Sequence, residues 1–214
     1  MKTFRRHLCV IGALSAAVWL LPIGRVSAQL VKSPADKPET ETRTPDVVYV
    51  PTPQAVVEKM LELAGVKAGD VVYDLGCGDG RIVVTAAKKY GVKAFGFDID
   101  PQRVKEALEN VKKNKVEKLV TIKQADVFTL DLTPASVVTL YLLPDLNVKL
   151  MPQLAKLKPG SRIVSHDFSM RGAKPESVHD ISAPYDSTKP GETGTLGHHT
   201  IYRWIVPWEK EATP

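Results

Sequence analysis

Short apolar runs alternate with amphipathic helical patterns between residues 47 and 165, and this alternation restricts the fold more than any other feature of the chain. Runs of strand length lie at 71–75, 92–97, 119–123, 136–142 and 162–165. Helical patterns lie at 53–64, 80–90, 101–114 and 145–157. Strands that alternate with helices pair in parallel, because each right-handed crossover returns the chain to the same edge of the sheet.

The helical pattern stops after the fifth strand. Residues 177–182 and 199–206 are two further strand candidates, and the loop between them is rich in Gly, Thr and Pro. Since no helix separates these two strands, they are expected to pair as an antiparallel hairpin at one edge. The sequence therefore predicts an α/β fold with a Rossmann-like, doubly wound sheet of seven strands, mostly parallel with an antiparallel C-terminal hairpin.

Residues 1–28 have the organisation of an export signal. A basic start from Lys2 to His7 precedes an apolar run from Leu8 to Leu21, and Val26-Ser27-Ala28 offers small residues to a signal peptidase. The apolar run of about 14 residues is shorter than the ~20 residues needed to cross a bilayer. The mature chain is expected to begin at Gln29 and to be exported to the bacterial periplasm or cell envelope.

Two alternatives stay open for this segment. It could remain as an uncleaved N-terminal anchor, and Arg5-Arg6 could direct the chain to the twin-arginine route, although the neighbouring residues fit that signal poorly. Residues 29–46 are rich in Pro, Thr, Lys and Glu and are expected to form a flexible linker. A domain over 47–208 and a short tail over 209–214 complete the expected organisation.

The formal charge of +5 would favour nucleic acid or anionic lipid as a partner if the basic residues were spread over the domain. Residues 1–28 contain four of them and no acid, which leaves 25 basic and 24 acidic residues in the rest of the chain. The sequence therefore predicts no nucleic-acid partner and no membrane contact beyond the possible anchor. Cys9 leaves with the signal, so Cys77 remains alone and no internal disulfide is expected.

The strongest local signal is Asp74-Leu75-Gly76-Cys77-Gly78-Asp79-Gly80-Arg81, which follows an expected strand and opens an expected helix. Glycines let the backbone turn tightly and approach a ligand, and free N–H groups at a helix start favour an anionic group. A nicotinamide-dependent dehydrogenase would require Gly-x-Gly-x-x-Gly. The third glycine position falls on Arg81 or Val83 in the two possible registers, so this alternative fits poorly.

The pattern Asp-x-Gly-x-Gly-x-Gly that begins at Asp74 resembles the first motif of the class I methyltransferases that use S-adenosylmethionine. The resemblance continues at Asp98, 22 residues after Gly76, and at Asp126 after the third expected strand. A Lys-Pro-Gly turn before the fifth strand is another feature of that family. The resemblance spans about residues 47–206 and implies S-adenosyl-L-methionine as the cofactor.

This resemblance also implies which residues hold the cofactor. Residues after the first strand would surround its methionine half, an acid after the second strand would accept from both ribose hydroxyls, and an acid after the third would accept from the adenine amino group. Two residues before the first helix would close the pocket. The implied cofactor-binding residues are Tyr49, Thr52, Asp74, Gly76, Cys77, Gly78, Asp98, Ile99, Asp126 and Val127. Asp79 and Asp100 are expected instead to stabilise helix starts.

The acceptor site is expected beyond the fourth strand, at Tyr141-Leu142-Leu143-Pro144. Methyltransferases of DNA adenine or of glutamine often carry Asn/Asp-Pro-Pro-Tyr/Phe here, so this apolar segment departs from those enzymes. Tyr141 and His166 are the candidate catalytic residues, with His166 either a proton acceptor or a structural partner of Asp167. Methyl transfer requires alignment and desolvation from the protein, so no metal is needed.

The glycine motif and the Leu-Pro segment most resemble the mitochondrial lysine methyltransferases that modify the ATP-synthase c subunit, and their bacterial relatives. This narrower resemblance favours a protein lysine as acceptor, and a small molecule stays open. His198 and His199 would point to opposite faces of a strand without a third ligand at suitable spacing, so no metal site is predicted. The alternative to an enzyme is an exported cofactor-binding module of the same fold without catalysis, since this cofactor is made in the cytoplasm.

Overall fold

The computed structural model describes residues 44–184 and 195–211. The expected signal at 1–28, most of the expected linker at 29–46 and the end of the expected tail, 212–214, lie outside the described residues. Within the described part of the chain, no helix has the length and apolar character that crossing a bilayer requires.

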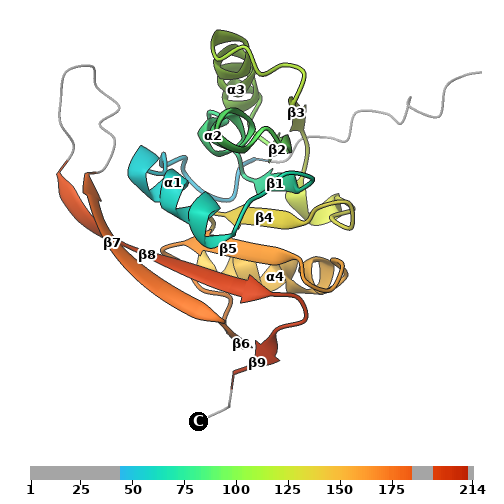
Figure 1. The fold of residues 1–214 in the computed structure, drawn as a ribbon, viewed down its shortest axis with the longest axis vertical. Coiled ribbons are helices and arrows are strands. Elements are labelled where there is room, and N and C mark those ends of the chain that lie inside the picture. Colours follow the sequence, from blue (N-terminus) through green and yellow to red (C-terminus); the bar gives the residue numbers. More distant parts are fainter. Residues whose placement is uncertain (1–43, 185–194, 212–214) are drawn as a thin grey trace, which may run out of the picture. The chain divides into compact units, whose positions relative to one another are not determined.

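Seven strands form one sheet in the order β3-β2-β1-β4-β5-β8-β7 (Figure 1). The strands are β1 (Val71–Leu75), β2 (Lys93–Asp98), β3 (Val120–Gln124), β4 (Val137–Leu140), β5 (Arg162–His166), β7 (Ser177–Pro184) and β8 (Leu196–Ile205). The first five pair in parallel, whereas β8 runs antiparallel to β5 and β7 runs antiparallel to β8. This arrangement confirms the predicted Rossmann-like sheet and its C-terminal hairpin at one edge.

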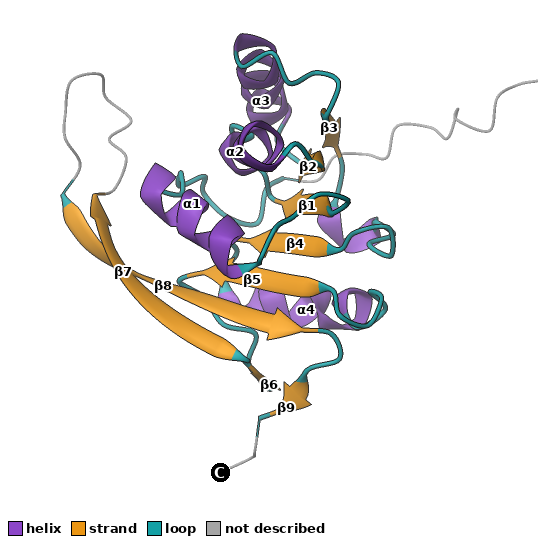
Figure 2. Ribbon diagram, in the orientation of Figure 1, coloured by secondary structure: helices purple, strands orange, loops and turns teal. Residues whose placement is uncertain are grey.

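Helices cover both faces of this sheet (Figure 2). They are α1 (Gln54–Leu63), α2 (Arg81–Tyr90), α3 (Pro101–Lys113) and α4 (Pro144–Leu154). Val72 of β1 packs in the core formed with α1, α2 and α3, whereas Leu75 of the same strand packs in the core formed with α4. Because both faces of the central strands are buried, the strands read as continuous apolar runs.

The start of α3 follows the local signals in the sequence. Asp100 is its N-cap and accepts a hydrogen bond from the Gln102 N–H at 2.8 Å, as expected for a short acid before Pro101. The end of α4 differs from the expectation, since this helix ends at Leu154 rather than at 157.

A second, two-stranded sheet pairs β6 (Ala173–Lys174) with β9 (Glu209–Lys210). The sequence did not predict it, because two-residue strands are too short to show a period-two pattern. Beside this sheet, the fully buried Trp204 of β8 donates from its indole Nε1 to the carbonyl oxygen of Ala173 at 2.9 Å. Trp204 packs in the core on the α4 face.

Candidate functional site

A cavity of about 330 Å³ opens at the carboxyl ends of β1, β2, β3 and β4. These strands place Asp74, Asp98, Asp126 and Tyr141 in its lining. Within the sheet, β2 and β3 lie on one side of β1, and β4 and β5 lie on its other side, so the strand order reverses direction at β1. Ligands of open α/β sheets bind at such a switch point.

Nine of the ten residues that the resemblance assigns to the cofactor line this cavity. They are Tyr49, Thr52, Asp74, Gly76, Cys77, Asp98, Ile99, Asp126 and Val127. Gly78 does not line it, and instead donates its N–H to Asp98 Oδ2 at 2.8 Å beneath the ring of Tyr49. The roles of these ten residues in cofactor binding stay predictions.

Asp74 is a buried carboxylate in the lining of the cavity. Its Oδ1 accepts a hydrogen bond from Thr139 Oγ1 at 2.7 Å, whereas Oδ2 has no hydrogen-bond partner among the described residues. Burial raises the pKa of Asp74 to about 7, and the charges of Asp98 and Asp79 add to this effect. A cationic group beside Oδ2 would restore the ionised form, so this position suits an ammonium group.

Asp98 ends β2 and holds the glycine turn in place. Its Oδ2 accepts from the Gly78 N–H at 2.8 Å and its Oδ1 accepts from the Asp100 N–H at 3.0 Å. Burial raises the pKa of Asp98, while these two N–H groups lower it. A carboxylate offers about four lone pairs, so each oxygen can accept once more. That remaining capacity matches the two hydroxyls of a vicinal diol.

Asp126 occupies the corresponding position after β3. It is the N-cap of a short 3-10 helix, η1 (Val127–Thr129), and its Oδ1 accepts from the Phe128 N–H at 3.0 Å. The cap therefore orients the carboxylate at the edge of the cavity. Ile99 and Val127 provide apolar lining near this acid.

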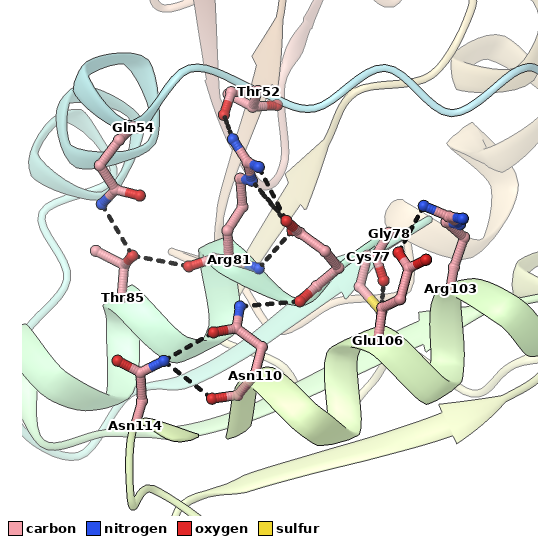
Figure 3. A network of polar contacts seen from close by, with 11 residues as sticks. Thr52, Gln54, Cys77, Gly78, Arg81, Thr85, Arg103, Glu106, Asn110 and Asn114 are labelled. Carbon is pink, nitrogen blue, oxygen red and sulfur yellow. Dashed lines mark hydrogen bonds and ion pairs between the residues drawn. The ribbon is translucent and has the colours of Figure 1, made fainter. Parts of the chain in front are cut away.

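Arg81 connects the segment before α1 to the glycine turn (Figure 3). Its guanidinium donates to both carboxylate oxygens of Asp79, with a shortest distance of 2.9 Å, and to the carbonyl oxygen of Thr52 at 2.8 Å. The planar fork of the arginine thereby fixes one wall of the cavity. The sequence indicated only a helix-start role for Asp79 and gave no signal for the contact of Arg81 with Thr52, because a contact with a backbone carbonyl 29 residues away has no periodicity.

Tyr49 covers the glycine turn from the same segment. A Cβ atom added to Gly78 would lie 2.1 Å from Cε2 of Tyr49, so the ring and the turn are in direct contact. The guanidinium of Arg103 lies over this ring, 4.8 Å from its centroid, and Arg103 is also paired with Glu106. Burial and the charge of Asp79 raise the pKa of Tyr49, which therefore stays a neutral phenol.

The two candidate catalytic residues lie in contact but at different depths. Tyr141 lines the cavity, and its ring centroid lies 3.9 Å from that of His166. His166 is fully buried outside the cavity lining, and its Nδ1 lies 3.3 Å from Oγ1 of Thr52. Burial lowers the pKa of His166 to about 4, although Asp167 opposes this shift. His166 contacts Tyr141 and Thr52, which line the cavity, but does not line it itself, and this favours a positioning role.

Behind Tyr141, His166 meets Asp167 and His199. The Nε2 atom of His166 lies 3.3 Å from Asp167 Oδ2, which is the structural pairing considered for these neighbours, and 2.9 Å from His199 Nδ1. His199 is buried, whereas the adjacent His198 is exposed near Ser182, as expected for opposite faces of a strand. The meeting of His199 with His166 was not predicted, because it depends on the pairing of β5 with β8.

Comparisons with known proteins agree with the geometry of the site. A family model described as ANTKMT methyltransferase domain matches residues 74–177. The chain is 46% identical over 164 residues to a protein-lysine N-methyltransferase of Saccharolobus islandicus (strain REY15A), which spans 76% of this chain and 95% of that protein.

A solved structure and a partial match show the same likeness. The structure is that of an RNA methyltransferase from Salinibacter ruber in complex with S-adenosyl-L-homocysteine, with 46% identity, a TM-score of 0.65 and coverage of 77% of this chain and 97% of that chain. A ribosomal protein L11 methyltransferase of Caldanaerobacter subterraneus subsp. tengcongensis is 36% identical over 89 residues, which is 42% of this chain and 28% of that protein. Each of these proteins is named as a methyltransferase, and the names give different methyl acceptors.

Proposed function

We propose that this chain, which belongs to the family of class I S-adenosylmethionine-dependent methyltransferases, transfers a methyl group to a lysine side chain of a protein. S-adenosylmethionine is the cofactor, and when bound it supplies the reactive methyl group. The residues of the chain have to hold this cofactor, align the acceptor nitrogen and exclude water.

The cavity lining fits a positively charged cofactor. Its carboxylates are Asp46, Asp74, Asp79, Asp98, Asp100 and Asp126, and its only cationic side chains are Arg81 and Arg103 among the described residues. Both arginines are paired with acids, Arg81 with Asp79 and Arg103 with Glu106. This excess of negative charge complements the sulfonium and ammonium groups of S-adenosylmethionine. Asp74 Oδ2 is the acceptor best placed for the ammonium group.

We expect the affinity for S-adenosylmethionine to decrease as the pH falls below about 7. Asp74 has a pKa of about 7 without cofactor because burial disfavours its charge, and a bound ammonium group favours the charged form. Binding then releases a proton below that pH, so affinity should fall by up to about tenfold per pH unit. Titration calorimetry between about pH 7.5 and about pH 5.5, below the ~7.7 pKa of an α-amino group, measures this dependence.

A variant of Asp74 tests whether this carboxylate causes the pH dependence of cofactor affinity. Asp74→Asn should bind more weakly and show a flatter pH dependence, and a wild-type affinity that is constant over this range would contradict the assignment.

Without cofactor, the folded pKa of Asp74 lies above the unfolded value of about 3.9. The ionised carboxylate therefore costs stability, and the contribution of this group to stability should decrease as the pH rises from about 4 to about 7.

The lysine acceptor is supported chiefly by the 46% identity to a protein-lysine N-methyltransferase over 95% of that protein. The rim after β4 is consistent with such an acceptor. Leu142 lines the cavity beside Tyr141, and the next residue, Leu143, is 46% exposed. A lysine with a pKa of about 10.4 has no free electron pair until it loses a proton. Apolar surroundings favour the neutral amine, so this rim would promote that loss.

The acceptor can be identified with S-adenosylmethionine that carries a tritiated methyl group. The full chain, incubated with this cofactor and a cell-envelope extract, should label protein in a form that protease releases and ribonuclease does not. Mass spectrometry should then place the methyl group on a lysine Nζ. Label confined to RNA would contradict a lysine acceptor and would favour the acceptor class named for the Salinibacter ruber relative.

A matched pair of variants tests the apolar rim. Leu143→Asp places a carboxylate beside the acceptor, where it should raise the pKa of the lysine and slow methylation about tenfold for each pKa unit. Leu143 is the N-cap of α4, where Asp is well tolerated. Val178→Asp on β7 is the control, because the two replaced side chains have similar exposure, 49% for Val178 and 46% for Leu143. Equal rates for the two variants would contradict a role for the rim.

We also propose that the chain is exported to the bacterial periplasm or cell envelope. The support is the sequence of residues 1–28, with its basic start, apolar run and small residues before Gln29. Fractionation of cells that express the full chain, followed by N-terminal sequencing, should give a periplasmic protein that begins at Gln29. A cytoplasmic protein that retains Met1 would contradict export.

A further inference from the structure

Three side chains that can bind a metal converge behind Tyr141. His166 ends β5, Asp167 follows it, and His199 lies on β8, the strand that pairs with β5. The separations are 2.9 Å between His166 Nε2 and His199 Nδ1, 3.3 Å between His166 Nε2 and Asp167 Oδ2, and 3.5 Å between His199 Nδ1 and Asp167 Oδ2. Both histidines are fully buried, whereas the side chain of Asp167 is 22% exposed.

We propose that His166, Asp167 and His199 bind a divalent transition-metal ion, for which zinc is the best fit. Bonds of about 2.0–2.2 Å in a tetrahedral zinc site separate neighbouring ligand atoms by about 3.3–3.6 Å. The observed triangle is close to one face of such a tetrahedron and is contracted along the edge between the histidines. Two imidazole nitrogens and one carboxylate oxygen also form the ligand set of zinc sites whose fourth position holds water.

Proton placement without an ion leaves this cluster poorly satisfied. One proton between the two rings accounts for the 2.9 Å contact of His166 with His199. Only one of these two nitrogens then carries a proton. Asp167 Oδ2 lies 3.3 Å from His166 Nε2 and 3.5 Å from His199 Nδ1, so it would face the electron pair of whichever nitrogen is unprotonated. Protons on both nitrogens would serve Asp167 but would collide with each other. A metal ion accepts all three electron pairs at once.

The surroundings hold two of these ligands in the manner of known metal sites. The second ring nitrogen of His166, Nδ1, lies 3.3 Å from Oγ1 of Thr52. The second oxygen of Asp167, Oδ1, accepts from the Thr200 N–H at 2.9 Å, and the Asp167 N–H donates to the Thr200 carbonyl at 2.7 Å. Outer partners of this kind set the tautomer of a ligating histidine and aim a ligating carboxylate.

An ion at this place would act on the cofactor cavity through Thr52. A bond to Nε2 of His166 leaves the ring proton on Nδ1, which then donates to Thr52 Oγ1. Thr52 lines the cavity, and its carbonyl accepts from Arg81. The ion would thus join β5 to β8 and stiffen the wall of the cavity, with His166 as a positioning residue. This inference does not depend on the identity of the methyl acceptor.

The test is a zinc titration of the full chain after removal of metals with a chelator. Competition with a chromophoric chelator should show one zinc ion per chain, and cobalt in place of zinc should give the visible absorption of a tetrahedral site. A free zinc concentration a hundredfold above Kd should shift the unfolding equilibrium about a hundredfold toward the folded state. Absence of stoichiometric zinc binding by the wild-type chain would overturn the proposal.

Variants locate the ion. His199→Ala should weaken zinc binding at least about a hundredfold, and His198→Ala is its matched control because it removes the neighbouring, exposed imidazole. Asp167→Asn should weaken zinc binding while its amide oxygen still accepts from Thr200, and Asn tolerates the φ of +57° at this position. Equal zinc affinity of His199→Ala and the wild-type chain, or an equal loss in His198→Ala, would overturn the proposed site.

Discussion

Replacing Asp98 by alanine should weaken the binding of S-adenosylmethionine by at least about a hundredfold and leave the domain folded. Charge-assisted hydrogen bonds contribute about 1.5–3 kcal/mol each, and both ribose hydroxyls would lose their acceptor. The Gly78 and Asp100 N–H groups would lose theirs as well, so the turn beside the cofactor would loosen. Titration calorimetry of the full chain measures the affinity, and circular dichroism checks the fold.

Two variants separate this role from a general effect of charge. Asp98→Asn keeps the shape and one acceptor oxygen, so its affinity should fall by only about tenfold. Asp131→Ala removes an exposed carboxylate that accepts from the Thr133 N–H outside the cavity, and its affinity should not change. An unchanged affinity of Asp98→Ala would refute the ribose role.

Gly78→Ala should lower the affinity for S-adenosylmethionine by at least about tenfold, because it displaces Tyr49 from the glycine turn. The added Cβ would lie 2.1 Å from Cε2 of Tyr49, a distance that neither the ring nor the turn can accept without moving. The backbone at Gly78 also has a φ of +53°, which costs any other L-residue about 1 kcal/mol. Both the cavity wall and the turn would therefore shift.

Gly65→Ala is the matched control, since Gly65 has a φ of +58° and a Cβ there would meet no atom within 4 Å. Both variants carry similar backbone strain, and only Gly78→Ala should lose affinity for the cofactor. In a Tyr49→Ala background, Gly78→Ala should cost little further affinity, because the two residues act through one contact. Equal loss in Gly65→Ala and Gly78→Ala would show that backbone strain, and not Tyr49, controls the pocket.

The parts of the fold that could be predicted have local causes. The strands appear as apolar runs because both of their faces are buried, and Asp100 with Pro101 marks the start of α3. The cavity residues were implied by the resemblance to class I methyltransferases, and they lie together because the carboxyl ends of parallel strands meet at one edge of the sheet. Asp74, Asp98 and Asp126 line one cavity for this reason.

The features that could not be predicted depend on contacts between distant parts of the chain. Arg81 reaches the Thr52 carbonyl across 29 residues, and His166 reaches His199 across 33 residues. Neither contact has a spacing that a helix or strand imposes. The histidine contact becomes visible only when the pairing of β5 with β8 is known, which is why a third ligand beside His199 was not found in the sequence.

Trp204 makes the folded state of this protein visible to fluorescence independently of its ligand. The indole is fully buried on the α4 face, with Nε1 bonded to the Ala173 carbonyl, so unfolding would shift its emission to longer wavelength. No tryptophan is among the described residues that line the cofactor cavity. A variant that loses the cofactor and keeps the short-wavelength emission of Trp204 has therefore lost its binding site and kept its core.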